Sequence, residues 1–156
     1  MTAFDDSTKF KTALESTPQH LSKVLIDEAL GIHKSKDVAA TEMQLASEFR
    51  QDSKSYVFMH LALEEAIKGD QAKNDPKFAA SLYRDLAVMD QAAAAAMDKD
   101  PLTAAVMLGE KTEEGMRDPY NAKNAIARAE RLDPANKDLP QLHLIQNDLA
   151  CNNTNL

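Results

Sequence analysis

The amino-acid sequence predicts a single all-α domain, and three observations lead to that expectation. The apolar residues, 44% of the chain, are mainly Ala, Leu and Met, which form helices readily. Only 5% of the 156 residues are aromatic and β-branched residues are sparse, so there is little material for a sheet. Apolar positions also recur at intervals of three and four residues, which is the spacing of one face of a helix.

Expected helices fill the first half of the chain. Residues 1–16 are polar and expected to be partly flexible, or to form a short helix over FKTALES. The next helix is expected to begin at Thr17-Pro18, since a hydroxyl cap followed by proline is typical of a helix start, and to be ended by Gly31 and the polar tract at 34–37. Asp37 is expected to cap the following helix, which ends at a loop over residues 51–55.

A further helix is expected from about Ser55 to Lys68, ending at Gly69-Asp70. Beyond it, four Asp-Pro pairs divide the chain, because Asp can cap the coming helix and Pro cannot continue the previous one. The longest helix should follow Asp75-Pro76 and continue through five alanines at 92–96. Shorter helices should follow at 101–115, 119–132 and 138–150, before a flexible tail at 151–156, so that residues 17–150 form one domain.

The distance between two of these prolines indicates a repeat. Pro101 and Pro134 lie 33 residues apart, and between them Leu108-Gly109 is followed by a small–large–small pattern at Ala122, Ile126 and Ala129. Residues 102–134 therefore resemble a tetratricopeptide repeat, although Thr112 stands where that family usually has Tyr. The resemblance implies hairpins stacked into a tetratricopeptide-like superhelix within residues 76–150. An irregular helical bundle is the alternative.

The residues that usually carry catalysis do not occur in recognisable patterns. None of the 4 His has the spacing of a di-iron or zinc motif, and a single Cys (Cys151) cannot supply a thiolate site. No Gly-rich phosphate loop or nucleophile elbow is present. We therefore expect no enzyme activity, no metal and no cofactor. His60 and Glu64 share a helix face, so a ligand or metal site there is an alternative to a core histidine.

Charge and hydropathy limit the classes of partner. The net charge of −7 opposes nucleic-acid binding, and no apolar run is long enough to insert into a membrane. The N-terminus lacks the features of a signal peptide, which favours a cytoplasmic location. A leader already removed, or secretion as an effector, is the alternative.

These observations predict a non-catalytic protein–protein interaction module, such as an adaptor, chaperone or assembly factor. A peptide or helix of the partner would lie on the helical-repeat surface. The candidate contact residues are Met89, Ala93, Met107, Asn121 and Asn124. The alternative is a small acidic inhibitor or effector that blocks a basic site on its target. The sequence names neither the partner nor an oligomeric state.

Overall fold

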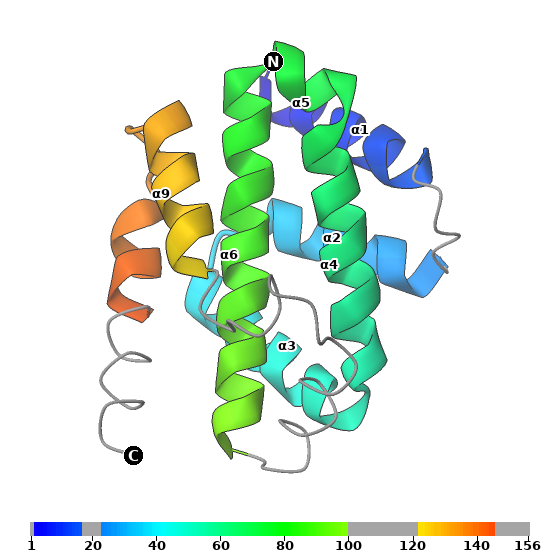
Figure 1. The fold of residues 1–156 in the computed structure, drawn as a ribbon, viewed down its shortest axis with the longest axis vertical. Helices are drawn as coiled ribbons and strands as arrows, with labels where there is room; N and C mark the ends of the chain where they lie inside the picture. The colour runs from blue at the N-terminus through cyan, green and yellow to red at the C-terminus, as the bar shows by residue number, and fades with distance from the viewer. Residues whose placement is uncertain (1, 17–22, 100–121, 146–156) are drawn as a thin grey trace.

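The computed structural model consists of helices and short connections, without a strand, in the residues that it describes: 2–16, 23–99 and 122–145 (Figure 1). This confirms the all-α prediction. The helices are α1 (Thr2–Glu15), α2 (Lys23–Lys34), α3 (Val38–Gln51), α4 (Ser53–Lys68), α5 (Asp70–Asn74), α6 (Pro76–Lys99) and α9 (Ala122–Leu132). Residues 139–145 are also helical. None of the described helices combines the length and apolarity needed to cross a bilayer.

Helix α6 forms the centre of an irregular helical bundle. It packs against α2, α3, α4, α5 and α9. Figure 1 shows α4 and α6 side by side with α5 connecting their upper ends, while α2 and α3 cross behind them and α9 lies on the other side. A helix surrounded in this way buries its whole circumference rather than a single apolar face. Every residue from Arg84 to Ala94 is accordingly buried.

Aspartates begin three of the helices, as their side chains accept hydrogen bonds from the first turn. Asp37 accepts from Ala40 N at 3.0 Å at the start of α3, and Asp75 accepts from Phe78 N at 3.1 Å at the start of α6. A hydrogen bond from Lys9 lowers the pKa of Asp75, with a smaller contribution from the Phe78 amide. The predicted starts at Asp37 and at Asp75-Pro76 are therefore confirmed, and α9 ends at Leu132, directly before Asp133-Pro134.

The predicted end of α2 is confirmed at the polar tract, whereas the predicted loop after α3 is wrong. Helix α2 ends at Lys34, the first residue of the polar tract at 34–37, and Gly31 lies inside it because a glycine within a helix lowers stability without forcing an end. The loop expected over residues 51–55 is reduced to Asp52, since α3 ends at Gln51 and α4 begins at Ser53. Asp52 serves both helices: its N–H donates to Glu48 O at 2.8 Å, and its carboxylate accepts from Lys54 N at 3.1 Å.

Other predicted features fall partly outside the described residues. These include the helix start at Thr17-Pro18, the first helix of the repeat-like stretch and the end of the chain. Of residues 102–134, the structure describes α9 and the start of the turn that follows it. Helix α9 packs along α6, with Ala122, Ile126 and Ala129 buried. At the N-terminus, α1 covers Thr2–Glu15 and includes the short helix expected over FKTALES.

Candidate functional site

The residues predicted to contact a partner lie in different surroundings. Met89 and Ala93 are fully buried in α6, because the apolar stripe of this helix faces α3, α4 and α9 rather than solvent. Their side chains therefore belong to the core. Asn124 is exposed on α9, whereas Met107 and Asn121 lie outside the described residues. The structure does not bring these residues together into a common surface.

His60 belongs to a buried polar cluster between α4 and α6. The Tyr56 hydroxyl donates to Asp90 Oδ1 at 3.1 Å, and His60 Nδ1 lies 3.6 Å from the same oxygen. His60 Nε2 lies 3.0 Å from Glu64 Oε1, so the two residues do share a helix face. Within the described part of the chain, no three His, Cys, Asp or Glu side chains are placed to hold a metal ion. This cluster connects α4 to α6. Its residues do not line any of the three hollows described below.

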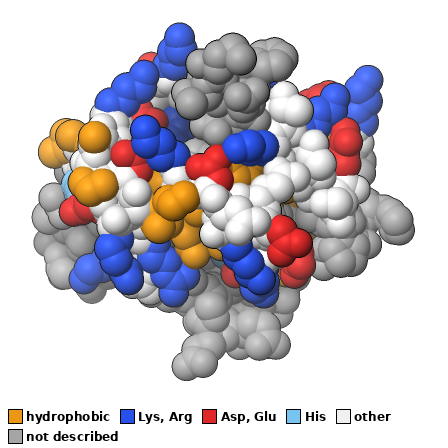
Figure 2. All heavy atoms as spheres, turned by 90° about the horizontal axis from the view of Figure 1, so that it is seen from above, with side chains coloured by type: hydrophobic (Ala, Val, Ile, Leu, Met, Phe, Trp, Pro, Cys, Tyr) orange, Lys and Arg blue, Asp and Glu red, His pale blue; other side chains and the backbone are white. Residues whose placement is uncertain are grey.

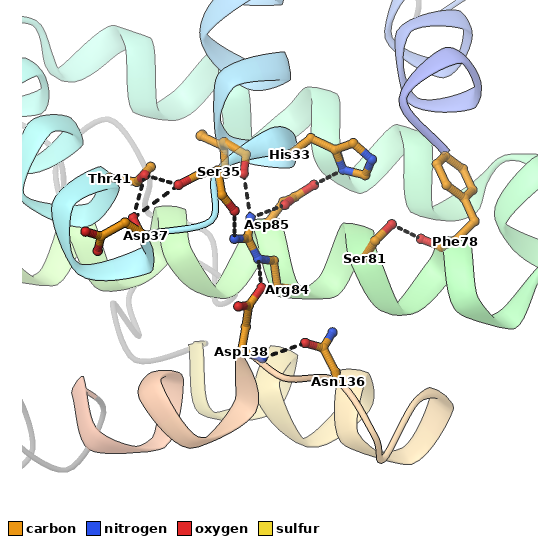
Figure 3. A network of polar contacts seen from close by, with 11 residues as sticks. His33, Ser35, Asp37, Thr41, Phe78, Ser81, Arg84, Asp85, Asn136 and Asp138 are labelled. Atoms are coloured by element: carbon orange, nitrogen blue, oxygen red, sulfur yellow. Dashed lines mark hydrogen bonds and ion pairs between the residues drawn. The ribbon is translucent and has the colours of Figure 1, made fainter. Parts of the chain in front are cut away.

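A second polar network is centred on Arg84, which α6 carries beside Asp85. Figure 3 shows the guanidinium reaching both the end of α2 and the turn before residues 139–145. Arg84 donates to the carbonyl oxygens of Ile32 and Ser35, each at 2.5 Å, and to Asp138 Oδ2 at 2.9 Å. It also contacts Asp85 Oδ1 at 3.0 Å, while His33 Nδ1 lies 2.6 Å from Asp85 Oδ2.

The network neutralises charges that are removed from solvent. The Arg84 side chain is 5% exposed and that of Asp85 is fully buried. Burial by itself would lower the pKa of Arg84, but the carboxylates of Asp85 and Asp138 outweigh it and raise the pKa above its ordinary value. Arg84 also donates to two carbonyls at and just beyond the C-terminal end of α2, those of Ile32, which additionally accepts from Ser35 N at 3.2 Å, and of Ser35. It therefore joins three segments far apart in sequence.

A cleft of about 510 Å³ opens in front of this network. We call it the Arg84 cleft. It is bounded by residues 33–36 at the end of α2, by Ser81 and Arg84 of α6, and by the turn that contains Asp133 and residues 135–138. Three lysines contribute to its walls: Lys34, Lys36 and Lys137. The cleft is thus more basic than the chain as a whole.

A second hollow surface lies between α2, α3 and the start of α4. It consists of two adjoining hollows of about 390 and 470 Å³, both lined by Val24, Glu28 and Glu48. Asp27 lines one hollow, and Asp52 and Phe58 line the other. We call this surface the acidic groove, because it has four carboxylates and a single cationic residue, Lys54.

Apolar side chains are exposed in the acidic groove. Val24 is 64% exposed and Phe58 is 43% exposed, although both are large hydrophobic residues. Glu28 Oε2 is buried and has no hydrogen-bond partner among the described residues. Burial raises the pKa of Glu28, and the nearby charges of Glu48 and Asp52 raise it further. The groove therefore combines uncovered apolar surface with carboxylates that repel one another.

Charges of both signs are mixed on one end of the molecule (Figure 2). Figure 2, which looks down on the upper end of the molecule in Figure 1, shows basic and acidic side chains interspersed around a small hydrophobic patch. No single sign of charge covers the described part of this face.

Sequence patterns gave only indirect indications of either surface. Arg84, Asp85, Asp90 and Gln91 interrupt the apolar face of a long alanine-rich helix, and such interruptions could have marked them as buried polar residues. Nothing in the sequence connects Asp85 to His33 or Arg84 to Asp138. Likewise, Glu28 and Glu48 lie on different helices, and only packing brings them to one groove.

Comparison of this chain with protein-family models, with curated proteins and with solved structures finds no significant match.

Proposed function

We propose that this protein is a non-catalytic protein-binding module, and that the acidic groove receives a basic, partly apolar segment of its partner. The observation that carries the proposal is the presence of four carboxylates and two exposed apolar side chains in one groove. A helical segment with Lys or Arg beside Leu, Ile or Val at spacings of three and four matches both features.

The carboxylates provide the electrostatic part of the proposal. Ionised Glu28 lies near Glu48 and Asp52, and its buried oxygen has no hydrogen-bond donor within the described residues. A Lys or Arg from a partner that pairs with these carboxylates offsets the repulsion among the three acids. Opposite charges across the interface also select a basic segment over an acidic one.

The exposed apolar residues provide the remaining part. Covering the exposed surfaces of Val24 and Phe58 contributes on the order of 1 kcal/mol for each side chain. The helices beneath the groove belong to a packed bundle, so little conformational entropy is lost on this side of the interface. The resemblance in residues 102–134 implies tetratricopeptide-like hairpins within residues 76–150. Such hairpins would also give an adaptor or chaperone a preformed scaffold.

An acidic inhibitor that covers a basic site on a folded target is the second candidate, and the net charge of −7 favours it. The two functions differ in what is recognised. A partner peptide that binds as tightly as its parent protein supports capture in the groove. Binding that requires the intact folded target supports the inhibitor.

The direct test uses a synthetic helical peptide of alternating Lys and Leu clusters at helical spacing, labelled for fluorescence anisotropy. We expect the Glu28→Gln/Glu48→Gln variant to bind this peptide about tenfold more weakly, which corresponds to about 1.4 kcal/mol. Phe58→Ser should also weaken binding, with a smaller change in salt dependence because no charge is removed.

The matched control is Glu15→Gln/Glu65→Gln, which changes the net charge equally but lies outside the residues lining the groove. It should bind the peptide as the wild type does. Equal weakening by both double variants would show that only overall charge matters, and the proposed groove would then be rejected. Proteins retained from a lysate by the control but lost by Glu28→Gln/Glu48→Gln would identify natural partners.

A further inference from the structure

We propose that the Arg84 cleft is a binding site for a small phosphate-bearing anion with at least two negative charges, such as a diphosphate group. This inference is independent of the acidic groove and of the proposed function. It rests on the cleft itself, on the charges that line it and on donors in its walls that remain available.

The charge of the cleft is opposite to that of the chain. Its lining has four cationic side chains, those of Lys34, Lys36, Arg84 and Lys137, against the two carboxylates of Asp133 and Asp138, while the Asp85 carboxylate behind this wall is paired with Arg84. The chain as a whole carries a net charge of −7. A concave site lined by one sign of charge concentrates oppositely charged ligands, and about 510 Å³ is within the range of small-molecule sites.

The three lysines have no ionic partner among the residues that the structure describes. Lys34, Lys36 and Lys137 are exposed, and none of them forms a salt bridge with another described residue. Lys34 lies in the last turn of α2, where a cation is favoured by the helix dipole. That explanation does not extend to Lys36, which follows the helix, or to Lys137 on the opposite turn.

Arg84 forms the buried inner wall of the cleft. Four of its five N–H groups donate to Asp138, Asp85, Ile32 and Ser35, which leaves one Nη2 hydrogen without an acceptor in the described part of the chain. These bonds fix the guanidinium, so a ligand does not have to order it. Asn136 contributes similarly, because its Oδ1 accepts from Asp138 N and its amide nitrogen is left as a donor.

The two carboxylates determine which anion fits. Asp138 is already paired with Arg84, but Asp133 opposes any anion in the cleft. A singly charged anion gains little against this repulsion, whereas a diphosphate can contact lysines on both walls at once. Phosphate oxygens also match the separated ammonium groups, which act as point charges without a fixed geometry.

The test is titration of the full chain with inorganic pyrophosphate at constant ionic strength, followed by calorimetry and by amide chemical shifts. We expect saturable binding with shifts concentrated in residues 33–36 and 133–138. The Lys34→Gln/Lys36→Gln/Lys137→Gln variant should raise the Kd at least tenfold. These three residues are exposed, so the variant should keep the helical circular dichroism of the wild type.

Lys68→Gln/Lys73→Gln/Lys77→Gln is the matched control, since its three lysines are also exposed and lie outside the cleft. It should retain the wild-type Kd. Equal weakening in both triple variants would show nonspecific attraction and overturn the inference. Wild-type shifts that are absent, or that lie outside the two named segments, would overturn it whatever the variants do.

Discussion

Arg84 performs a structural task that no single backbone interaction could perform. Its guanidinium donates hydrogen bonds to a carbonyl at the end of α2, to the adjacent Asp85 and to the Asp138 carboxylate. Asp138 precedes the helical residues 139–145, and its carbonyl accepts the first helical bond from Leu142 N at 3.0 Å. One side chain on α6 therefore positions two helix ends that are more than a hundred residues apart in sequence.

We predict that Arg84→Met destabilises the protein by about 3 kcal/mol, because it leaves Asp85 buried without its main counter-charge. His33 lies 2.6 Å from Asp85 and will offset part of the loss when it is protonated. Chemical denaturation measures the effect. Arg131→Met, at an exposed position on α9, should change stability by less than about 0.5 kcal/mol. Equal effects of the two substitutions would contradict the role assigned to Arg84.

Glu28 should give the protein a distinct dependence on pH. Its pKa is raised above 4.5, so the folded state binds this proton more tightly than the unfolded state does. The contribution of Glu28 to stability therefore falls as pH rises from about 4.5 through the folded-state pKa. We predict that Glu28→Gln is more stable than the wild type at neutral pH, and that the difference disappears as pH approaches 4.5.

Thermal unfolding of both proteins across this pH range measures that difference. Glu65→Gln makes the same change in net charge outside the acidic groove and separates a local effect from a general one. A Glu28→Gln variant that is less stable than the wild type at neutral pH would contradict the prediction.

At the scale of elements, α6 shows why small residues are needed at a crowded crossing. Ala92, Ala93 and Ala96 have no exposed surface, so the neighbouring groups approach the α6 backbone closely. A larger side chain at such a position forces its neighbours to move. The alanine run thus contributes close packing as well as helix propensity.

We predict that Ala93→Leu destabilises the protein by about 1–3 kcal/mol through overpacking. Ala127→Leu is the control, since Ala127 is exposed on α9 and should accept the larger side chain with little change. Urea denaturation of the two variants gives the comparison. If Ala93→Leu were as stable as Ala127→Leu, Ala93 would not lie in a close-packed core.

For the whole molecule, the central position of α6 has a consequence for unfolding. Because α6 contacts α2, α3, α4, α5 and α9, its loss would uncover the apolar faces of all five. We therefore predict one cooperative transition, in which far-ultraviolet circular dichroism and tyrosine absorbance give the same midpoint. Arg84→Met should shift both curves together. Two separated transitions in the wild type would show that part of the bundle unfolds independently of α6.

The two hollow surfaces also have to be considered at this scale. The acidic groove includes Gly31 and Ile32 of α2, and the Arg84 cleft begins at His33 on the same helix. Their linings differ in charge, and the overall charge of −7 has the same sign as that of the acidic groove only. A net charge is a sum over the chain, and it hides a local concentration of the other sign.

Composition and local pattern alone establish the all-α class, the starts of α3 and α6, and the end of α9, because propensity and aspartate capping act over a few residues. The same patterns suggested Met89 and Ala93 as contacts for a partner but could not show that other helices cover both side chains. Burial depends on contacts between distant parts of the chain. Only the packing of the helices therefore decided that Arg84 pairs with Asp138 and that Asp85 pairs with His33. It also decided that Glu28 and Glu48 line one groove.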